Sequence, residues 1–125
     1  MPLDPSLIIF VEELFAPLGL VRVRKMFSGG GIYCDGVMFG LISRNTIYLK
    51  VDQSTIPAFK AEGSAPFVYK SRSKLVEMSY WRLPDRLLDD TDEAIDWAKR
   101  ALEIVRKNHK KEHSQKLLKR SEHKK

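Results

Sequence analysis

The chain holds few residues that could catalyse a reaction. Its single cysteine is Cys34, and its three histidines, His109, His113 and His123, all lie near the C-terminal end. A cysteine nucleophile needs a base beside it, and no histidine of the remaining chain is available for that role. Rather than a nucleophile or redox sensor, Cys34 is expected to be a small, half-buried strand residue, because free cysteines are often part of a core.

Metal and acid–base chemistry have equally little support. His109 and His113 are four residues apart, but no cysteine or carboxylate group completes an obvious ligand set. The paired carboxylates Glu12-Glu13 and Asp89-Asp90 are expected on the solvent face of one helix and at the start of another. We therefore expect no metal, no cofactor and no enzymatic activity. A small enzyme or ligand-binding domain, with a pocket between sheet and helices, ranks last among the alternatives.

The run Gly29-Gly30-Gly31 invites comparison with phosphate-binding loops. Those loops open a helix and end in Lys-Ser/Thr or follow a fixed glycine spacing, whereas here a strand follows and neither spacing fits. The run instead predicts a bulge or a close approach between two strands.

Aromatic and basic residues alternate on several expected strands, and these could recognise a macromolecule. Such a face could stack nucleic-acid bases or bind a protein, because Tyr, Trp and Arg dominate interface hot spots; core packing of the rings is the third interpretation. Alternation places Tyr80 and Trp81 on opposite faces without saying which is exposed. The candidate surface comprises Lys25, Lys50, Tyr80, Trp81 and Arg82.

The C-terminal tail carries the excess charge. Residues 106–125 hold nine basic and two acidic residues, a net charge of +7, so the other 105 residues carry −1 of the chain's total of +6. Clustered Lys and Arg favour salt-dependent, sequence-independent binding to DNA or RNA; a merely solvated end is the alternative. The candidate nucleic-acid-binding residues are Arg106, Lys107, Lys110, Lys111, Lys116, Lys119 and Arg120.

The totals are typical of one globular domain. The chain has 125 residues, of which 43% are hydrophobic and 30% charged, enough for a single core. We expect no membrane span, because no apolar run approaches the required length of about 20 residues. With no secretory signal at Met1-Pro2-Leu3-Asp4, we expect a cytoplasmic protein.

The strands are expected around a meander. Two short apolar runs meet at a tight turn at Asp35-Gly36, and a second turn at Arg44-Asn45 links segment 37–43 to segment 46–51. Alternation predicts that Ile47, Leu49 and Val51 face the core, and that Val37, Phe39 and Leu41 do the same on the neighbouring strand. A first strand from Val21 to Phe27 and two later strands, 66–69 and 75–83, complete an antiparallel sheet of about five strands.

Three helices are expected along the chain: one before the strands, one between them and one after them. Asp4 and Pro5 predict the start of a first helix. Segment 52–63 is expected to form a short second helix. Asp90 with Glu93 forms a capping box for a third, whose apolar stripe ends at Val105. The fold class is therefore α+β in the order α-β-β-β-α-β-β-α. A domain over residues 1–105 is followed by a tail over 106–125, which is either a helical extension or disordered.

Several motifs resemble the N-terminal domain of the TfoX/Sxy family over Val21 to Leu102. They are Lys25-Met26-Phe27, the glycine run, Met38-Phe39-Gly40, Tyr48-Leu49-Lys50-Val51-Asp52 and Met78-Ser79-Tyr80-Trp81-Arg82-Leu83-Pro84. The resemblance implies a layout similar to secretion-chaperone-like folds. It supplies no catalytic residues. Family members usually carry a second, C-terminal helical domain, and here a basic tail stands in its place.

The resemblance also implies a function. Competence regulators of this family act with the cyclic-AMP receptor protein at promoters, so a transcription-related protein is the expected partner, with weak nucleic-acid affinity from the tail. The alternative is a self-sufficient, non-specific nucleic-acid-binding protein. A homodimer is compatible with this layout, although no residues in the sequence specify its interface.

Overall fold

The computed structural model describes residues 3–26 and 29–123, with side chains up to Lys111. Phe27, the expected end of the first strand, lies outside the described residues. The N-terminal part contains α1 (Pro5–Leu14), the 3-10 helix η1 (Ala16–Leu18), β1 (Val21–Met26), β2 (Gly29–Cys34), β3 (Val37–Ser43) and β4 (Thr46–Lys50). The C-terminal part contains α2 (Ile56–Ala61), β5 (Pro66–Ser71), β6 (Lys74–Arg82), the 3-10 helix η2 (Asp85–Asp89) and α3 (Thr91–His123).

The strands form one antiparallel sheet in the order β1-β2-β3-β4-β6-β5. This confirms the α+β class. The sheet has six strands rather than about five, and four of them precede α2, because the glycine run belongs to β2 instead of interrupting the chain. The two expected tight turns are also confirmed: Asp35-Gly36 and Arg44-Asn45 all have positive φ angles, as the hairpin turn requires.

A β-bulge in β3 changes which side chains share a face. Ile32 pairs with Gly40 but Tyr33 pairs with Met38, so Phe39 is an extra residue in β3. Alternation restarts after it. The prediction that Leu41 faces the core together with Phe39 is therefore wrong: Leu41 pairs with Tyr48 and lies on the opposite face of the sheet.

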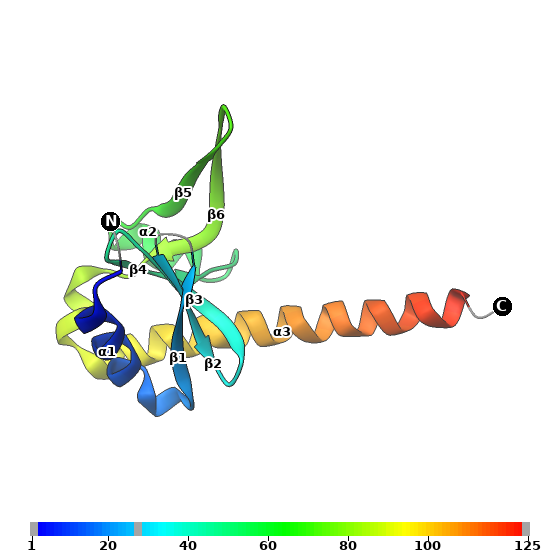
Figure 1. The fold of residues 1–125 in the computed structure, drawn as a ribbon, viewed down its shortest axis with the longest axis horizontal. Coiled ribbons are helices and arrows are strands. Elements are labelled where there is room, and N and C mark those ends of the chain that lie inside the picture. Colours follow the sequence, from blue (N-terminus) through cyan, green and yellow to red (C-terminus); the bar gives the residue numbers. More distant parts are fainter. Residues whose placement is uncertain (1–2, 27–28, 124–125) are drawn as a thin grey trace.

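The helices cover one face of the sheet (Figure 1). Asp4 caps α1 by accepting a hydrogen bond from the Ser6 N–H at 2.9 Å, and Pro5 occupies its first turn, as expected. The buried side chains of α1, α2 and α3 form a single core with those of the strands. Each fully buried Leu, Ile, Val or Phe in such a core contributes roughly 1.5–3 kcal/mol of hydrophobic stabilisation.

Two features of the helix layer depart from or extend the expectations. Glu12 is half-buried rather than solvent-facing, and its carboxylate accepts a hydrogen bond from the Val23 N–H at 2.9 Å, so α1 covers the β1 edge of the sheet. At the start of α3, the Glu93 N–H donates to the Asp90 carboxylate at 3.2 Å, which confirms the cap. Arg86 forms ion pairs with Glu62, at 2.6 Å, and with Glu93, and thereby links α2, η2 and α3.

Helix α3 continues without interruption beyond the core. The apolar stripe predicted for this helix is buried as far as Val105, and residues 106–111 are exposed. The helical backbone runs on to His123, which adds roughly 27 Å at 1.5 Å per residue. This segment extends away from the sheet (Figure 1).

Candidate interaction surface

The sheet face opposite the helices is the candidate site, and we call it the open sheet face. Strand register and alternation assign its residues: Gly31 pairs with Leu41, Leu41 with Tyr48, and Lys50 with Tyr80. Its side chains are Arg22, Arg24, Met26, Tyr33, Met38, Leu41, Tyr48, Lys50, Phe67, Tyr69, Met78, Tyr80 and Arg82.

Aromatic rings on the open sheet face pack with basic groups and with each other. The Arg24 guanidinium lies 4.8 Å from the centre of the Tyr33 ring, and the Lys50 ammonium 5.2 Å from that of Tyr80. The Tyr48 and Phe67 rings are 5.2 Å apart. These contacts hold the rings in fixed positions before any partner binds, which lowers the entropic cost of binding.

Lys50 and Tyr80 form the most defined part of this surface. The Lys50 ammonium donates a hydrogen bond to the Ser79 hydroxyl at 2.6 Å, which positions the charge beside the Tyr80 ring. Burial, and secondarily Tyr33, raises the pKa of the Tyr80 hydroxyl. The phenol thus stays protonated and can donate a hydrogen bond at neutral pH.

Gly31 makes room for the aromatic layer. A Cβ atom at this position would lie 2.9 Å from Cε1 of Tyr33 and 3.2 Å from the sulfur of Met38. The Tyr33 ring therefore lies over β2 only because residue 31 has no side chain. Gly29 also approaches its neighbour closely, since a Cβ there would be 2.1 Å from the Ile42 carbonyl oxygen. The close backbone approach predicted for the glycine run is confirmed.

The open sheet face is positively charged. Among its described strand residues, four are basic and none is acidic. Arg82 is neutralised by Asp85, at 3.0 Å, whereas Arg22, Arg24 and Lys50 form no ion pair within the part of the chain that the structure describes. This face therefore suits an acidic or anionic partner with apolar groups.

Three of the five residues predicted for a binding surface share this face, namely Lys50, Tyr80 and Arg82. The other two do not. Trp81 is 7% exposed and packs in the core against Phe59, at 6.4 Å between ring centres; Trp97 of α3 packs against the same Phe59 ring, at 4.7 Å. Lys25 pairs with Gly30, whose missing Cβ would touch Leu3 and Val23, so Lys25 points to the helix-covered side.

Sequence reasoning missed Met38, Leu41 and Phe67 as members of this face. For Leu41 the bulge at Phe39 reverses the alternation, and the sequence carries no clear signal for it. Met38 precedes the bulge and follows the predicted alternation, but it was not considered as a binding residue. A second register shift between Pro66 and Val68 affects Phe67 in the same way. Arg24 and Tyr33 also lie on this face. The sequence could have indicated them, because they are a basic and an aromatic residue on neighbouring expected strands.

The basic tail contributes a separate cluster of charge. Arg106, Lys107, Lys110 and Lys111 are exposed on α3, and Arg106 lies 3.7 Å from the Asp35 carboxylate. The side chains of Lys116, Lys119 and Arg120 lie outside the described residues. The helical backbone makes the tail an extension of the domain, in agreement with one of its two predicted states.

Among the described residues, the groups considered for catalysis do not assemble into a site. Cys34 is fully buried, and desolvation, reinforced by Asp35, raises the pKa of its thiol, which disfavours the reactive thiolate. Within the described ranges no three His, Cys, Asp or Glu residues are grouped to hold a metal ion. A shallow groove of about 370 Å³ between α3 and the loop before α2 has a lining of mixed charge, formed by Asp52, Ser54, Thr55, Arg100, Glu103, Ile104 and Lys107.

No helix in the described residues combines the length and the apolar character needed to cross a membrane.

Comparisons with known proteins identify the family of the chain. No curated protein matches the chain significantly. Residues 13–105 match the TfoX N-terminal domain, and this segment spans the sheet, α2 and the packed part of α3. The match covers most of the chain, which therefore belongs to the TfoX N-terminal domain family.

Proposed function

We propose that this chain is a non-enzymatic regulatory domain that binds a transcription-related protein through the open sheet face. The observation that carries this proposal is the composition of that face, where ordered tyrosines lie among basic groups and none of the described side chains on the face is acidic. Aromatic and Arg side chains contribute most to protein interfaces. A partner segment with acidic and apolar side chains would complement this surface.

The family suggests which partner to test first. Competence regulators with a similar domain act with the cyclic-AMP receptor protein, and a partner of that type is the first choice here. In this proposal the domain itself carries the protein contact, while the basic helix of α3 supplies weak attraction to nearby DNA. Exposed Lys107, Lys110 and Lys111 would contact phosphates, and each neutralised phosphate would steepen the salt dependence of binding.

The protein contact is tested by titrating purified cyclic-AMP receptor protein in a calorimeter. The double variant Arg24→Glu/Lys50→Glu is expected to weaken binding at least tenfold, because it reverses the two charges that lie over tyrosine rings. Lys60→Glu/Lys99→Glu, an equal charge change on exposed helix positions, serves as control and should bind like the original chain. Equal affinity of all three proteins would reject the open sheet face as the contact.

The same face also supports a second candidate function, a self-sufficient nucleic-acid-binding protein, because tyrosines beside cations can stack on bases. Fluorescence anisotropy with duplex and single-stranded DNA at two salt concentrations separates the two. The proposal expects binding to fall in Lys107→Glu/Lys110→Glu/Lys111→Glu and to persist in Arg24→Glu/Lys50→Glu. The reverse pattern would favour the second candidate.

A further inference from the structure

The outer half of the β5–β6 hairpin has no support from the rest of the sheet. β6 pairs with β4 only from Tyr80 to Arg82, and one further bond joins the Val51 N–H to the Ser79 carbonyl at 3.0 Å. From Lys74 to Glu77, β6 pairs with β5 alone. The hairpin therefore projects from the body of the domain as a two-stranded ribbon (Figure 1).

This ribbon exposes apolar side chains. Leu75 is 77% exposed, Val68 44% and Tyr69 42%. The register places Val68 and Leu75 on one side of the ribbon and Tyr69 with Val76 on the other. An isolated two-stranded ribbon is only marginally stable in water, so a surface that covers these side chains would stabilise it.

The end of the hairpin is basic. Lys70, Arg72 and Lys74 are exposed, with Glu77 as the one acidic residue of segment 66–78. None of the three basic residues forms an ion pair within the described chain. The covering surface must therefore combine apolar area with negative charge. Two hairpins facing each other would repel, so pairing of β5 with a second β5 is disfavoured.

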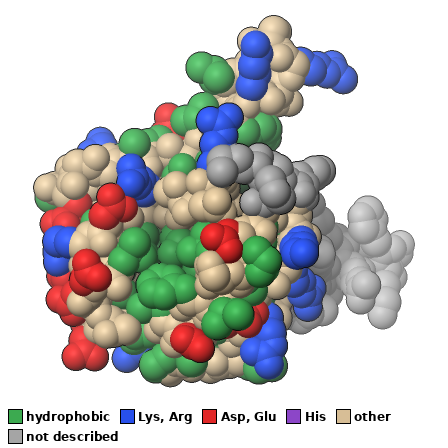
Figure 2. All heavy atoms as spheres, turned by 60° about the vertical axis from the view of Figure 1, so that its left-hand side comes forward, with side chains coloured by type: hydrophobic (Ala, Val, Ile, Leu, Met, Phe, Trp, Pro, Cys, Tyr) green, Lys and Arg blue, Asp and Glu red, His purple; other side chains and the backbone are tan. Residues whose placement is uncertain are grey.

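The same chain carries a surface of the required kind on another side. Segment 85–96 holds six acidic residues against Arg86, a net charge of −5. Its residues Asp89, Asp92 and Asp96 are exposed and form no ion pair among the described residues. Exposed apolar side chains lie on η2 and α1: Leu88, Ile9 and Phe10. Figure 2, turned toward the α1 side of the molecule, shows a hydrophobic patch bordered by acidic side chains.

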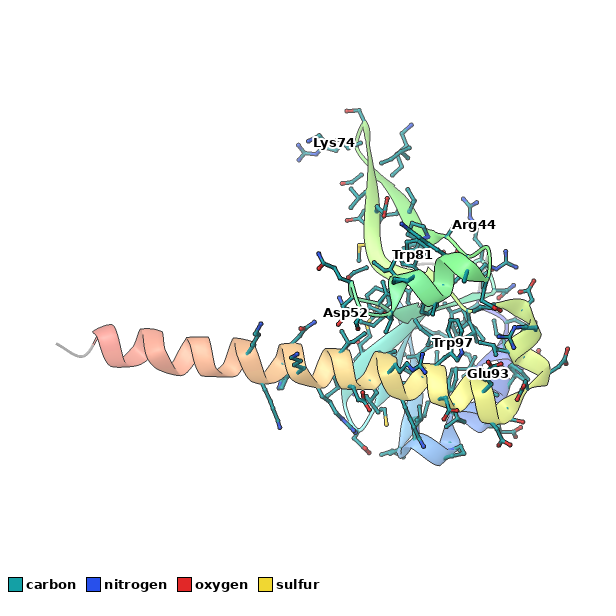
Figure 3. The ribbon with its side chains drawn as sticks, turned by 180° about the vertical axis from the view of Figure 1, so that it is seen from behind. Arg44, Asp52, Lys74, Trp81, Glu93 and Trp97 are labelled. Atoms are coloured by element: carbon teal, nitrogen blue, oxygen red, sulfur yellow. The ribbon has the colours of Figure 1, made fainter. Side chains whose placement is uncertain are left out.

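The hairpin does not reach this acidic side within its own molecule. In Figure 3, Lys74 lies at the far end of the hairpin, which points away from the body, whereas Glu93 lies at the opposite side near the start of α3. A second copy of the chain supplies the missing surface. Reciprocal use by two copies closes the assembly around a two-fold axis and leaves neither hairpin free.

We propose that two copies of this chain form a dimer in which the β5–β6 hairpin of each copy lies on the acidic side of the other, formed by segment 85–96 and the exposed apolar residues of η2 and α1. Leu75 and Val68 contact the apolar residues, while Lys70, Arg72 and Lys74 pair with the aspartates. The apolar contact uses the side of the ribbon that carries Leu75 and Val68, opposite to Tyr69 of the open sheet face, so the dimer and the proposed partner are separable.

Light scattering coupled to size-exclusion chromatography tests this on the full chain across a concentration series. The unmodified chain should elute with the mass of a dimer. The hairpin variant Lys70→Glu/Arg72→Glu/Lys74→Glu and the acidic-side variant Asp89→Lys/Asp92→Lys/Asp96→Lys should each raise the dimer dissociation constant at least tenfold. An equimolar mixture of the two variants should restore association, because the first then presents the acidic hairpin that the second's basic side attracts.

Three results would overturn the proposal. One is a monomer at all concentrations up to about 100 μM, a value at which even a weak contact of about −5.5 kcal/mol would be half-formed. The second is an acidic-side variant that dimerises normally, which would indicate pairing between hairpin edges. The third is a mixture that stays monomeric.

Two further variants test whether unfolding, and not loss of the contact, causes any loss of dimerisation. Lys99→Glu/Lys107→Glu/Lys110→Glu makes the same charge change on α3 and should keep the dimer. Leu75→Ser removes a side chain that is already exposed in the single chain, so its circular dichroism should match the unmodified chain while its dissociation constant rises several-fold. Unchanged dimerisation of Leu75→Ser would contradict the proposed contact.

Discussion

The helix-covered face and the open face of the sheet are built from the same strands but are covered differently. On the covered face, Leu49 and Phe39 are fully buried under the helices. On the open face, Tyr48 and Lys50 are half-buried, Tyr48 against the Phe67 ring and Lys50 against the Tyr80 ring. Apolar packing on the covered face therefore stabilises the domain, which leaves the aromatic and basic side chains of the open face available to a partner.

The largest expected loss of stability comes from creating a cavity on the helix-covered face of the sheet. Phe39→Ala removes a fully buried ring that packs edge-on against Phe15 at 5.7 Å, and should lower the free energy of unfolding by about 3–5 kcal/mol. Tyr48→Ala on the open face should cost less than half as much. Urea unfolding followed by circular dichroism measures both, with Phe39→Leu as a milder variant. Equal losses at the two positions would contradict the assignment of the faces.

The next effect tests the aromatic layer of the open face. Gly31→Ala places a Cβ 2.9 Å from the Tyr33 ring and should lower the free energy of unfolding by about 1–3 kcal/mol through overpacking. The same change in a Tyr33→Ala background should cost clearly less, because the clashing ring is gone. Four urea unfolding curves give this double-mutant cycle, and a cost that does not depend on Tyr33 would disprove the clash.

A smaller effect concerns the cation on the open face. A double-mutant cycle of Lys50→Met with Tyr80→Leu should give a coupling of about 0.5–1 kcal/mol, typical of a partly solvated cation over a ring; Tyr80 itself is only 9% exposed. Lys50→Met combined with Phe67→Leu serves as the comparison, because the Lys50 ammonium lies over the Tyr80 ring and not over Phe67, and it should give additive losses. Chemical denaturation measures both cycles. Zero coupling between Lys50 and Tyr80 would remove their contact from the description of this face.

The smallest effect concerns acid sensitivity of the helix layer. The hydrogen bond from Arg86 lowers the pKa of Glu93 below its ordinary 4.5, so the ion pair stabilises the fold above that pH and is lost as the pH falls through the lowered value. Glu93→Gln should therefore reduce stability slightly at pH 7 and flatten its decline toward pH 3. Thermal unfolding at both pH values measures this, and identical slopes for the two proteins would contradict it.

Local features of the fold could be predicted because each depends on neighbouring residues. Asp35-Gly36 accommodates the positive φ angles of a tight turn, and Asp4 with Pro5 begins a helix, whatever the remaining chain does. The apolar stripe that ends at Val105 likewise follows from helical periodicity. For these reasons the α+β class and most boundaries could be predicted, whereas the strand count differed where glycines obscured the start of β2.

The candidate surface could be predicted only in part. Alternation correctly separates Tyr80 from Trp81, but it does not say which of them a helix covers. The bulge at Phe39 reverses the phase of β3 after it, so Leu41 was predicted on the wrong face. The bulge depends on how β3 pairs with β2, and the burial of Trp81 depends on which face the helices cover; alternation within one strand specifies neither.

The amino-acid sequence by itself determined where the turns, helix ends and strands lie and where the excess positive charge sits, because these are properties of short segments. Only the tertiary structure decided that the helices bury Trp81 and leave Tyr80 on the opposite face, and that Arg24, Tyr33 and Lys50 belong to one surface. The physical reason is that a strand presents two equivalent faces until register, bulges and the packing of helices make one of them the core.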